Sequence, residues 1–207
     1  MGGSPGSGGV IARLFVQATF FVLCDTYATE LPSVRPPDVI PLGVSAMPLY
    51  IVPKGDVQAT PTKRLNDQTL RDLAHRAANE EVGAANFETK LSYKFADDRI
   101  TEVDLTFMLT IEMPVWPNYG HRPEAERREW DRFYRALLEH EQGHIAIFRR
   151  EARGTFTVLL AEQRSTIEDK LVQETERIQR LSDAYDRDTD HGRKQKTSNG
   201  TTIIVAR

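Results

Sequence analysis

The chain has almost no cysteine, and this scarcity excludes two kinds of site. Its 207 residues include a single cysteine, Cys24. A disulfide within one chain needs two thiols, and a cysteine-based zinc site needs several. A chain of this length can bury a hydrophobic core without such cross-links. Any metal site is therefore expected to consist of histidine and carboxylate side chains.

An excess of one charge sign is also lacking. The 27 lysine and arginine residues nearly balance the 30 aspartate and glutamate residues, which gives a formal net charge of −3. Proteins that bind nucleic acid typically carry a strong basic stripe, and none occurs here. No stretch is long and apolar enough for an ordinary membrane-spanning helix. We therefore expect no nucleic-acid partner and no stable membrane span in the mature chain.

The N-terminal residues have the order of a secretory signal. A glycine- and serine-rich start is followed by Arg13, the apolar run Leu14–Leu23 and the small-residue site Thr26-Tyr27-Ala28. This order is typical of a signal peptide cleaved after Ala28, which would remove Cys24 and place the protein outside the cell or in the periplasm. The alternative interpretation is a short buried helix or strand of the folded domain.

Proline divides the rest of the chain. Residues 29–48 contain five prolines and are expected to form an extended linker. Residues 49–192 carry the periodic patterns and are expected to form one domain. Residues 193–207 form a C-terminal tail, in which Thr202–Ala206 is either a final strand or a disordered end.

The first part of the domain has patterns typical of a sheet with one helix. Leu49–Pro53 is a candidate strand, and a helix capped by Asn66 or Asp67 is expected to run to about Glu81. Apolar and polar residues then alternate on both sides of a polar turn at Ala96–Arg99, which predicts an antiparallel hairpin. The inward-facing residues of its two strands are Leu91, Tyr93 and Phe95, then Val103, Leu105, Phe107, Leu109, Ile111 and Met113.

The run His140-Glu141-Gln142-Gly143-His144 is the most informative motif in the chain. Two histidines four residues apart on a helix point the same way, so that both imidazoles can bind one metal ion. The glutamate beside the first histidine can reach a water on that metal and act as general base. This is the chemical content of the H-E-x-x-H pattern, and zinc is the metal that suits it best.

The surrounding residues predict a long helix that starts near Pro123. Apolar residues share one stripe with both histidines, so the pair faces the buried side. Gly143 stands out, because glycine inside a helix costs about 1 kcal/mol relative to alanine. Either another backbone or a substrate passes close to the helix there, or the glycine only packs against a neighbour.

A catalytic zinc usually takes three protein ligands and leaves one position for water. Which residue supplies the third ligand depends on where the chain turns back into the second helical pattern. A turn at Gly154 would bring Glu162 or Glu168 level with the motif. A turn near Ser165, where Ser165 and Glu168 could form a capping box, places His144 about 30 Å from the turn.

In that second arrangement the returning helix ends near Tyr185, and the segment Tyr185–Gly192 arrives beside the metal. We prefer this arrangement and predict His191 as the third ligand, since a histidine followed by glycine just past a helix end is well placed to bind. Glu162, Glu168 and the aspartates of residues 186–190 remain alternatives.

These segments resemble those of a known bacterial family. HEQGH, the approach Met113-Pro-Val-Trp-Pro117 and the segment YDRDTDHG at 185–192 look like a domain of unknown function whose members are described as predicted secreted zinc-dependent proteases. The resemblance covers roughly Leu49 to Gly192. The chain departs from the metzincin pattern, because no glycine and histidine follow His144 at the required spacing.

The resemblance implies export, zinc and peptidase activity. It implies that His140 and His144 are ligands, that Glu141 is the base and that His191 is the third ligand. It also implies that Tyr185 and Asp190 support the ligands or the transition state.

Taken together, the patterns predict an α+β fold. A small antiparallel sheet with one N-terminal helix is followed by a long antiparallel helix pair that carries the metal site. The predicted function is that of a zinc metallopeptidase of the cell envelope, acting on a peptide or protein. Glu141 would take the proton of the attacking water, and Tyr185 would donate to the oxyanion. The alternatives are a zinc-dependent hydrolase of a cell-wall amide and a non-catalytic envelope binding protein.

Overall fold

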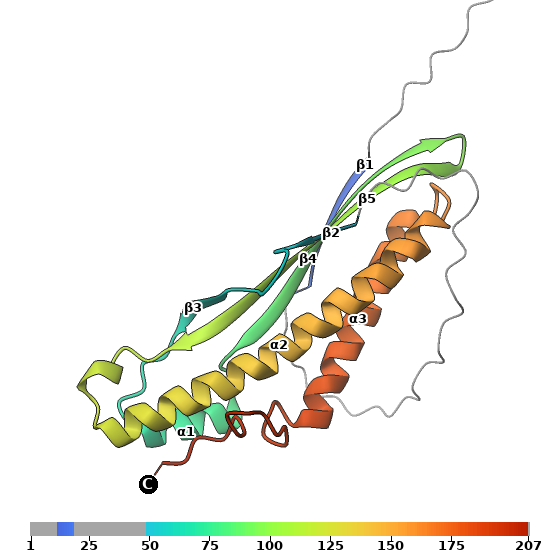
Figure 1. The fold of residues 1–207 in the computed structure, drawn as a ribbon. Coiled ribbons are helices and arrows are strands. Elements are labelled where there is room, and N and C mark those ends of the chain that lie inside the picture. The colour runs from blue at the N-terminus through green and yellow to red at the C-terminus, as the bar shows by residue number, and fades with distance from the viewer. Residues whose placement is uncertain (1–11, 19–48, 207) are drawn as a thin grey trace, which may run out of the picture.

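The computed structural model describes residues 12–18 and 49–206 (Figure 1). In these residues a mixed sheet is combined with three α-helices and one short 3-10 helix. The elements in chain order are β1 (Ala12–Ala18), β2 (Leu49–Val52), β3 (Ala59–Arg64), α1 (Leu70–Asn79), β4 (Ala84–Ala96), β5 (Arg99–Val115), the 3-10 helix (Tyr119–His121), α2 (Glu124–Leu160) and α3 (Ile167–Thr189).

The hairpin of β4 and β5 is the centre of the sheet, and it confirms the predicted alternation. The two strands pair antiparallel from Ala84 opposite Glu112 to Ala96 opposite Arg99. α2 lies along the sheet and contacts both strands (Figure 1). Phe87 of β4 and Phe148 of α2 are both fully buried, and their ring centroids lie 4.7 Å apart. The core therefore sits between the hairpin and the helix that carries the motif.

We expected a small sheet that is antiparallel throughout, and this expectation is wrong. β2 and β3 both run parallel to β5, with Leu49 opposite Leu105 and Ala59 opposite Ile111. The 17 residues of β5 are long enough for both short strands to pair one after the other along the same edge. β3 was not predicted, because its exposed residues around Pro61 show no alternation.

β1 lies within the segment that resembles a signal peptide. It pairs antiparallel with β4, from Ala12 opposite Tyr93 to Ala18 opposite Phe87. This pairing matches the alternative interpretation, a strand of the domain, for these seven residues. Cys24, the cleavage site at Ala28 and the linker at 29–48 lie outside the described residues. The signal peptide therefore stays a prediction.

α1 begins at Leu70, and its cap is Thr69 rather than the predicted Asn66 or Asp67. Thr69 accepts a hydrogen bond from the backbone N–H of Asp72, and the Asp72 carboxylate accepts one from the Thr69 N–H. This reciprocal pair satisfies two N–H groups at the helix start. Asp67, one of the predicted caps, instead forms an ion pair with Arg76 at 2.8 Å.

α2 continues past Gly154 to Leu160, and α3 returns beside it (Figure 1). The chain therefore turns near Ser165, which confirms the second arrangement. The predicted capping box of Ser165 and Glu168 is absent: Thr166 stands at the N-cap and its side chain caps no N–H of the helix, while Glu168 accepts a hydrogen bond from Tyr93. None of the helices in the described part of the chain has the length and apolarity that crossing a membrane requires.

A partly buried ionic network joins α3 to α2. Arg177 of α3 donates to Glu151 of α2 at 2.7 Å and to Glu174 of its own helix at 3.0 Å. The Glu174 carboxylate is also 3.5 Å from the hydroxyl of Thr155. Such directional contacts hold one alignment of two helices better than apolar packing alone. The network lies about two turns beyond His144, so it also sets what α3 presents to the motif.

Replacing Arg177 with methionine is expected to lower the free energy of unfolding by about 1–3 kcal/mol, because the buried carboxylate of Glu174 and the partly buried carboxylate of Glu151 lose their cation. Urea denaturation of the full chain measures the effect. Arg180→Met on the same helix is the matched control, since that side chain is 67% exposed and should change stability by less than about 0.5 kcal/mol. Equal losses in the two variants would contradict a role for the network.

Candidate metal centre

Three buried side chains converge where α3 passes the HEQGH motif. Nε2 of His140 lies 3.0 Å and Nε2 of His144 lies 3.1 Å from Oδ1 of Asp186, and the two nitrogens are 3.3 Å apart. His140 and His144 come from successive turns of α2, and Asp186 comes from α3. Each of the three residues is at most 5% exposed. Together they form the one group in the described residues whose ligand atoms could hold a metal ion.

The triangle of ligand atoms has the dimensions of a metal site. Zinc binds imidazole nitrogen and carboxylate oxygen at about 2.0–2.2 Å, and two ligands of a tetrahedral ion are then about 3.3 Å apart. The three observed separations, 3.0, 3.1 and 3.3 Å, are close to that spacing. A divalent ion therefore fits among the three atoms with little movement of the side chains.

Hydrogen bonds on the far side of each imidazole support the same conclusion. Nδ1 of His140 is 3.0 Å from the amide oxygen of Gln195, which can only accept, so this nitrogen carries the proton. Nε2 of a neutral His140 then points a lone pair at the Asp186 carboxylate. The lone pair of this nitrogen and the carboxylate oxygen repel each other unless a positive charge lies between them. A second proton or a metal ion supplies that charge. The donor set of two imidazoles and one carboxylate suits zinc and other divalent ions.

His144 is oriented in a similar way. Its Nδ1 lies 2.6 Å from the hydroxyl of Ser182, which is fully buried one helical turn before Asp186. Ser182 and Asp186 therefore share the face of α3 that is turned toward α2. Through these two residues, the same face of α3 contacts both ring nitrogens of His144.

The Asp186 carboxylate is suited to be the anionic member of the group. Burial raises its pKa, but the hydrogen bonds with His140 and His144 outweigh burial, and the pKa ends well below its usual range. The side chain is therefore charged at neutral pH. A charged, buried oxygen between two imidazoles is what a divalent cation requires.

Glu141 lies beside the group rather than in it. It is 3% exposed, and its carboxylate packs so closely on Gly83 that a Cβ there would be 2.9 Å from Oε1. Burial and the nearby charges of Glu81 and Asp186 raise its pKa well above the ordinary value. His140, Glu141 and His191 all line a cavity of about 30 Å³, which is enough for one ordered water.

Glu81 lines the same cavity, although no sequence pattern singles it out. Burial and the charge of Asp186 raise its pKa to about 7. Glu81 follows Glu80 just past the end of α1, in a stretch that has the polar composition of an ordinary helix end. Only the fold of the connection from α1 to β4 brings it to the motif.

Tyr185 packs directly against both histidines. Its ring stacks on His140 with centroids 5.1 Å apart and meets His144 edge-on at 4.9 Å. Its hydroxyl donates to Gln195 at 3.0 Å. A Cβ at Gly143 would lie 2.2 Å from the Tyr185 hydroxyl oxygen, so the glycine makes room for this ring. Of the two interpretations of Gly143, packing against a neighbour is the one that the structure supports.

The other candidates for third ligand lie in different places. His191 stands just past α3, with Nδ1 3.6 Å from Oδ1 of Asp186 and a side chain 45% exposed. It is adjacent to the three-residue group but outside it. Glu162 binds Thr166 at the turn, about 25 Å along the helix from His144. Glu168 lies at the same end of α3, and Asp190 pairs with exposed Lys194 at 3.8 Å.

Comparison with known proteins gives a family without an assigned activity. The model of a family described as bacterial protein of unknown function (DUF922) matches residues 56–192. The match contains the motif and the three converging residues, and it stops where the C-terminal segment begins. No curated protein and no solved structure matches the chain.

Proposed function

We propose that this chain, which belongs to that bacterial family of unknown function, is a zinc-dependent peptidase. One observation carries the proposal. A group of two histidines and one aspartate with metal-site spacing lies beside a cavity of the size of one water, and His140 of the group lines that cavity together with Glu141. This is the arrangement that metal-assisted hydrolysis requires: ligands, a water position and a base beside it.

His140, His144 and Asp186 would hold the metal. Zinc bound there lowers the pKa of its water toward about 7 and polarises the carbonyl of the substrate. Glu141 accepts a proton from the water in the cavity and delivers it to the leaving amine. Burial raises the pKa of Glu141, so its carboxylate binds a proton more strongly than that of an exposed glutamate.

Tyr185 would act on the oxyanion. Burial raises the pKa of its hydroxyl, which therefore keeps its proton and remains a donor. In the structure the hydroxyl is engaged by Gln195, 3.0 Å away. Donation to a substrate oxygen requires it to exchange that partner. The hydrogen bond donated to the substrate oxygen would stabilise negative charge that exists only in the transition state.

His191 remains a proposed ligand. Its Nδ1 is 3.6 Å from the Asp186 oxygen, little more than the spacing of about 3.3 Å between two ligands of one ion. A small rotation of this half-exposed side chain would bring it to the metal. With His191 as a fourth ligand, the site would have no open position for water, which is typical of structural zinc.

That closed arrangement favours a second candidate, a metal-stabilised envelope protein that binds a partner. The cavity of about 30 Å³ admits a water but no peptide unless the residues that line it move.

A hydrolase of a cell-wall amide would use the same residues as a peptidase, and only its substrate differs. The location in the cell envelope belongs to the proposal as well and rests on the N-terminal sequence.

The test is hydrolysis by the purified full chain with and without metal. We expect about one zinc per chain, cleavage of a mixed peptide library, loss of cleavage on dialysis against a chelator, and recovery when zinc is returned. Cleavage of cell-wall fragments but not peptides would select the amide hydrolase. Stoichiometric zinc without either activity would select the metal-stabilised protein, and no zinc would contradict a metal site.

A further inference from the structure

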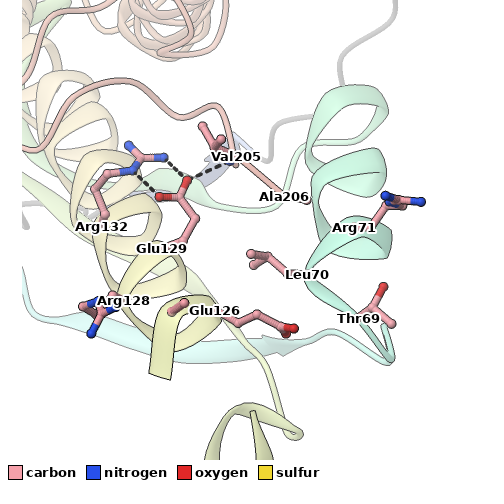
Figure 2. A pocket seen from close by; sticks show the side chains of 10 residues that line it. Thr69, Leu70, Arg71, Glu126, Arg128, Glu129, Arg132, Val205 and Ala206 are labelled. Atoms are coloured by element: carbon pink, nitrogen blue, oxygen red, sulfur yellow. Dashed lines mark hydrogen bonds and ion pairs between the residues drawn. The ribbon is translucent and has the colours of Figure 1, made fainter. Parts of the chain in front are cut away.

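The residues after α3 form a C-terminal strap, residues 192–206, which is held on α2 through its backbone. The guanidinium of Arg132 donates to three strap carbonyls, those of Asn199, Thr201 and Ile203. Glu129, ion-paired with Arg132 at 2.7 Å, accepts the backbone N–H of Val205 at 2.7 Å. Figure 2 shows this pair and Val205 at the edge of the pocket between α1 and α2.

The other end of the strap is fixed beside the metal centre. Thr202 donates its hydroxyl to the carbonyl of His191 at 2.7 Å and its N–H to the carbonyl of Gly192 at 3.3 Å. Gly192 has a φ of +80°, and a Cβ there would lie 2.6 Å from the Thr202 methyl. Residues 192–202 of the strap therefore form a loop whose two ends meet next to His140.

Gln195 is the strap residue that reaches the metal centre. Its amide oxygen accepts from Nδ1 of His140 and from the hydroxyl of Tyr185, both at 3.0 Å. The two bonds hold the stacked rings of these residues in one orientation. Because the oxygen can only accept, the proton of a neutral His140 stays on Nδ1 and the lone pair of Nε2 stays turned toward Asp186.

We infer that the C-terminal strap is part of the metal centre, with Gln195 as a positioning residue for His140. Partners of this kind select the tautomer of a metal-binding histidine and fix its ring, and losing one typically costs about 10–100-fold in metal affinity. Arg132 acts one step further away, because it holds the strap in the place from which Gln195 reaches the ring. The inference rests on the metal binding in the proposed function and does not require peptidase activity.

Zinc affinity of the full chain, measured by competition with a chromophoric chelator, tests the inference. We expect Gln195→Leu to bind zinc about 10–100-fold more weakly than the wild type. Gln195→Glu keeps an accepting oxygen and should restore affinity close to wild type, which a merely structural defect would not. Lys196→Leu is the matched control, since it alters the next, exposed strap residue and should leave affinity unchanged.

A double-mutant cycle tests the role of Arg132. If Arg132 acts through Gln195, Arg132→Met weakens zinc binding in the wild type but adds little to Gln195→Leu. Nitrogen-15 spectra of the imidazoles add a direct signature. The proton of His140 should sit on Nδ1 in the zinc-bound wild type, and its resonance should broaden or shift in Gln195→Leu.

The outcomes separate this inference from the proposed function. Equal zinc affinity in Gln195→Leu and the wild type would overturn the inference while leaving the peptidase intact. Weakened zinc binding with rescue by Gln195→Glu would support it, even where the wild type cleaves no peptide and the peptidase assignment falls. A wild type that binds no zinc overturns both.

Discussion

Replacing Glu141 with glutamine is expected to lower the rate of hydrolysis by about 10²–10⁴-fold while zinc stays bound. Glutamine has nearly the same size as glutamate, but its amide cannot take a proton from water. Glu141 is not among the three converging ligands, so the metal site should remain. Its carboxylate accepts a backbone hydrogen bond from Ala85, and the amide oxygen of glutamine can accept the same bond.

Both kcat and zinc content need to be measured for this variant. Glu176→Gln is the control, because Glu176 lies on α3 with a side chain 64% exposed and loses the same charge far from the cavity. We expect this control to match the wild type in rate and in metal. Full hydrolysis by Glu141→Gln would exclude Glu141 as the base. Loss of zinc from it would mean that the glutamate supports the ligands instead.

Replacing Asp186 with alanine should remove zinc, and replacing His191 with alanine should weaken zinc binding far less. Asp186 contacts both imidazoles and is the only anion of the three-residue group, whereas His191 lies at its exposed rim. The loss from Asp186→Ala should therefore exceed the roughly 10–100-fold that removing a partner of a ligand costs. Hydrolysis should be abolished together with the metal.

Asp188→Ala is the matched control for the same helix end, because Asp188 is exposed two residues away. The comparison also decides between the two candidate third ligands. If His191→Ala loses zinc and Asp186→Ala keeps it, the choice of His191 from sequence is right. Asp186 would then serve as a hydrogen-bond partner of the two histidines rather than a ligand.

The sequence predicted which segment meets the motif, because helical rise is a fixed length per residue. Counting from a turn near Ser165 brings residues 185–192 level with His144, and the structure confirms that turn. Which residue of the segment faces the motif depends on where α3 ends. We expected it to end near Tyr185, but it continues to Thr189. Asp186 therefore stays on the helical face that already carries Ser182.

The sheet likewise shows what a periodic sequence pattern can and cannot predict. Alternation predicted the hairpin of β4 and β5, because a half-buried strand must place every second residue in the core. Alternation carries no information on strand direction, so the parallel pairing of β2 and β3 with β5 was missed. β3 is largely exposed and includes Pro61, and it has no pattern to detect.

Gln195 and Glu81 could not be selected from the sequence, because no periodic pattern covers them. Each reaches the metal centre from a connection without a periodic pattern, and each looks like one polar residue among many. Tyr185 was predicted as a donor, and its packing on His140 and Gly143 now explains the glycine in the motif. Side chains from irregular segments enter a site only through tertiary structure.

The way Arg132 holds the strap has a consequence for how the sequence of the strap can change. Arg132 binds backbone oxygens of the strap, and Glu129 binds a backbone N–H. Every amino acid offers the same carbonyl, so mutations that change most strap side chains leave this attachment intact. Selection would then fall on Arg132, Glu129 and Gln195 and on the contact of Gly192 with Thr202, while the other strap residues drift. Homologous tails are expected to look unrelated in sequence and yet lie in the same place.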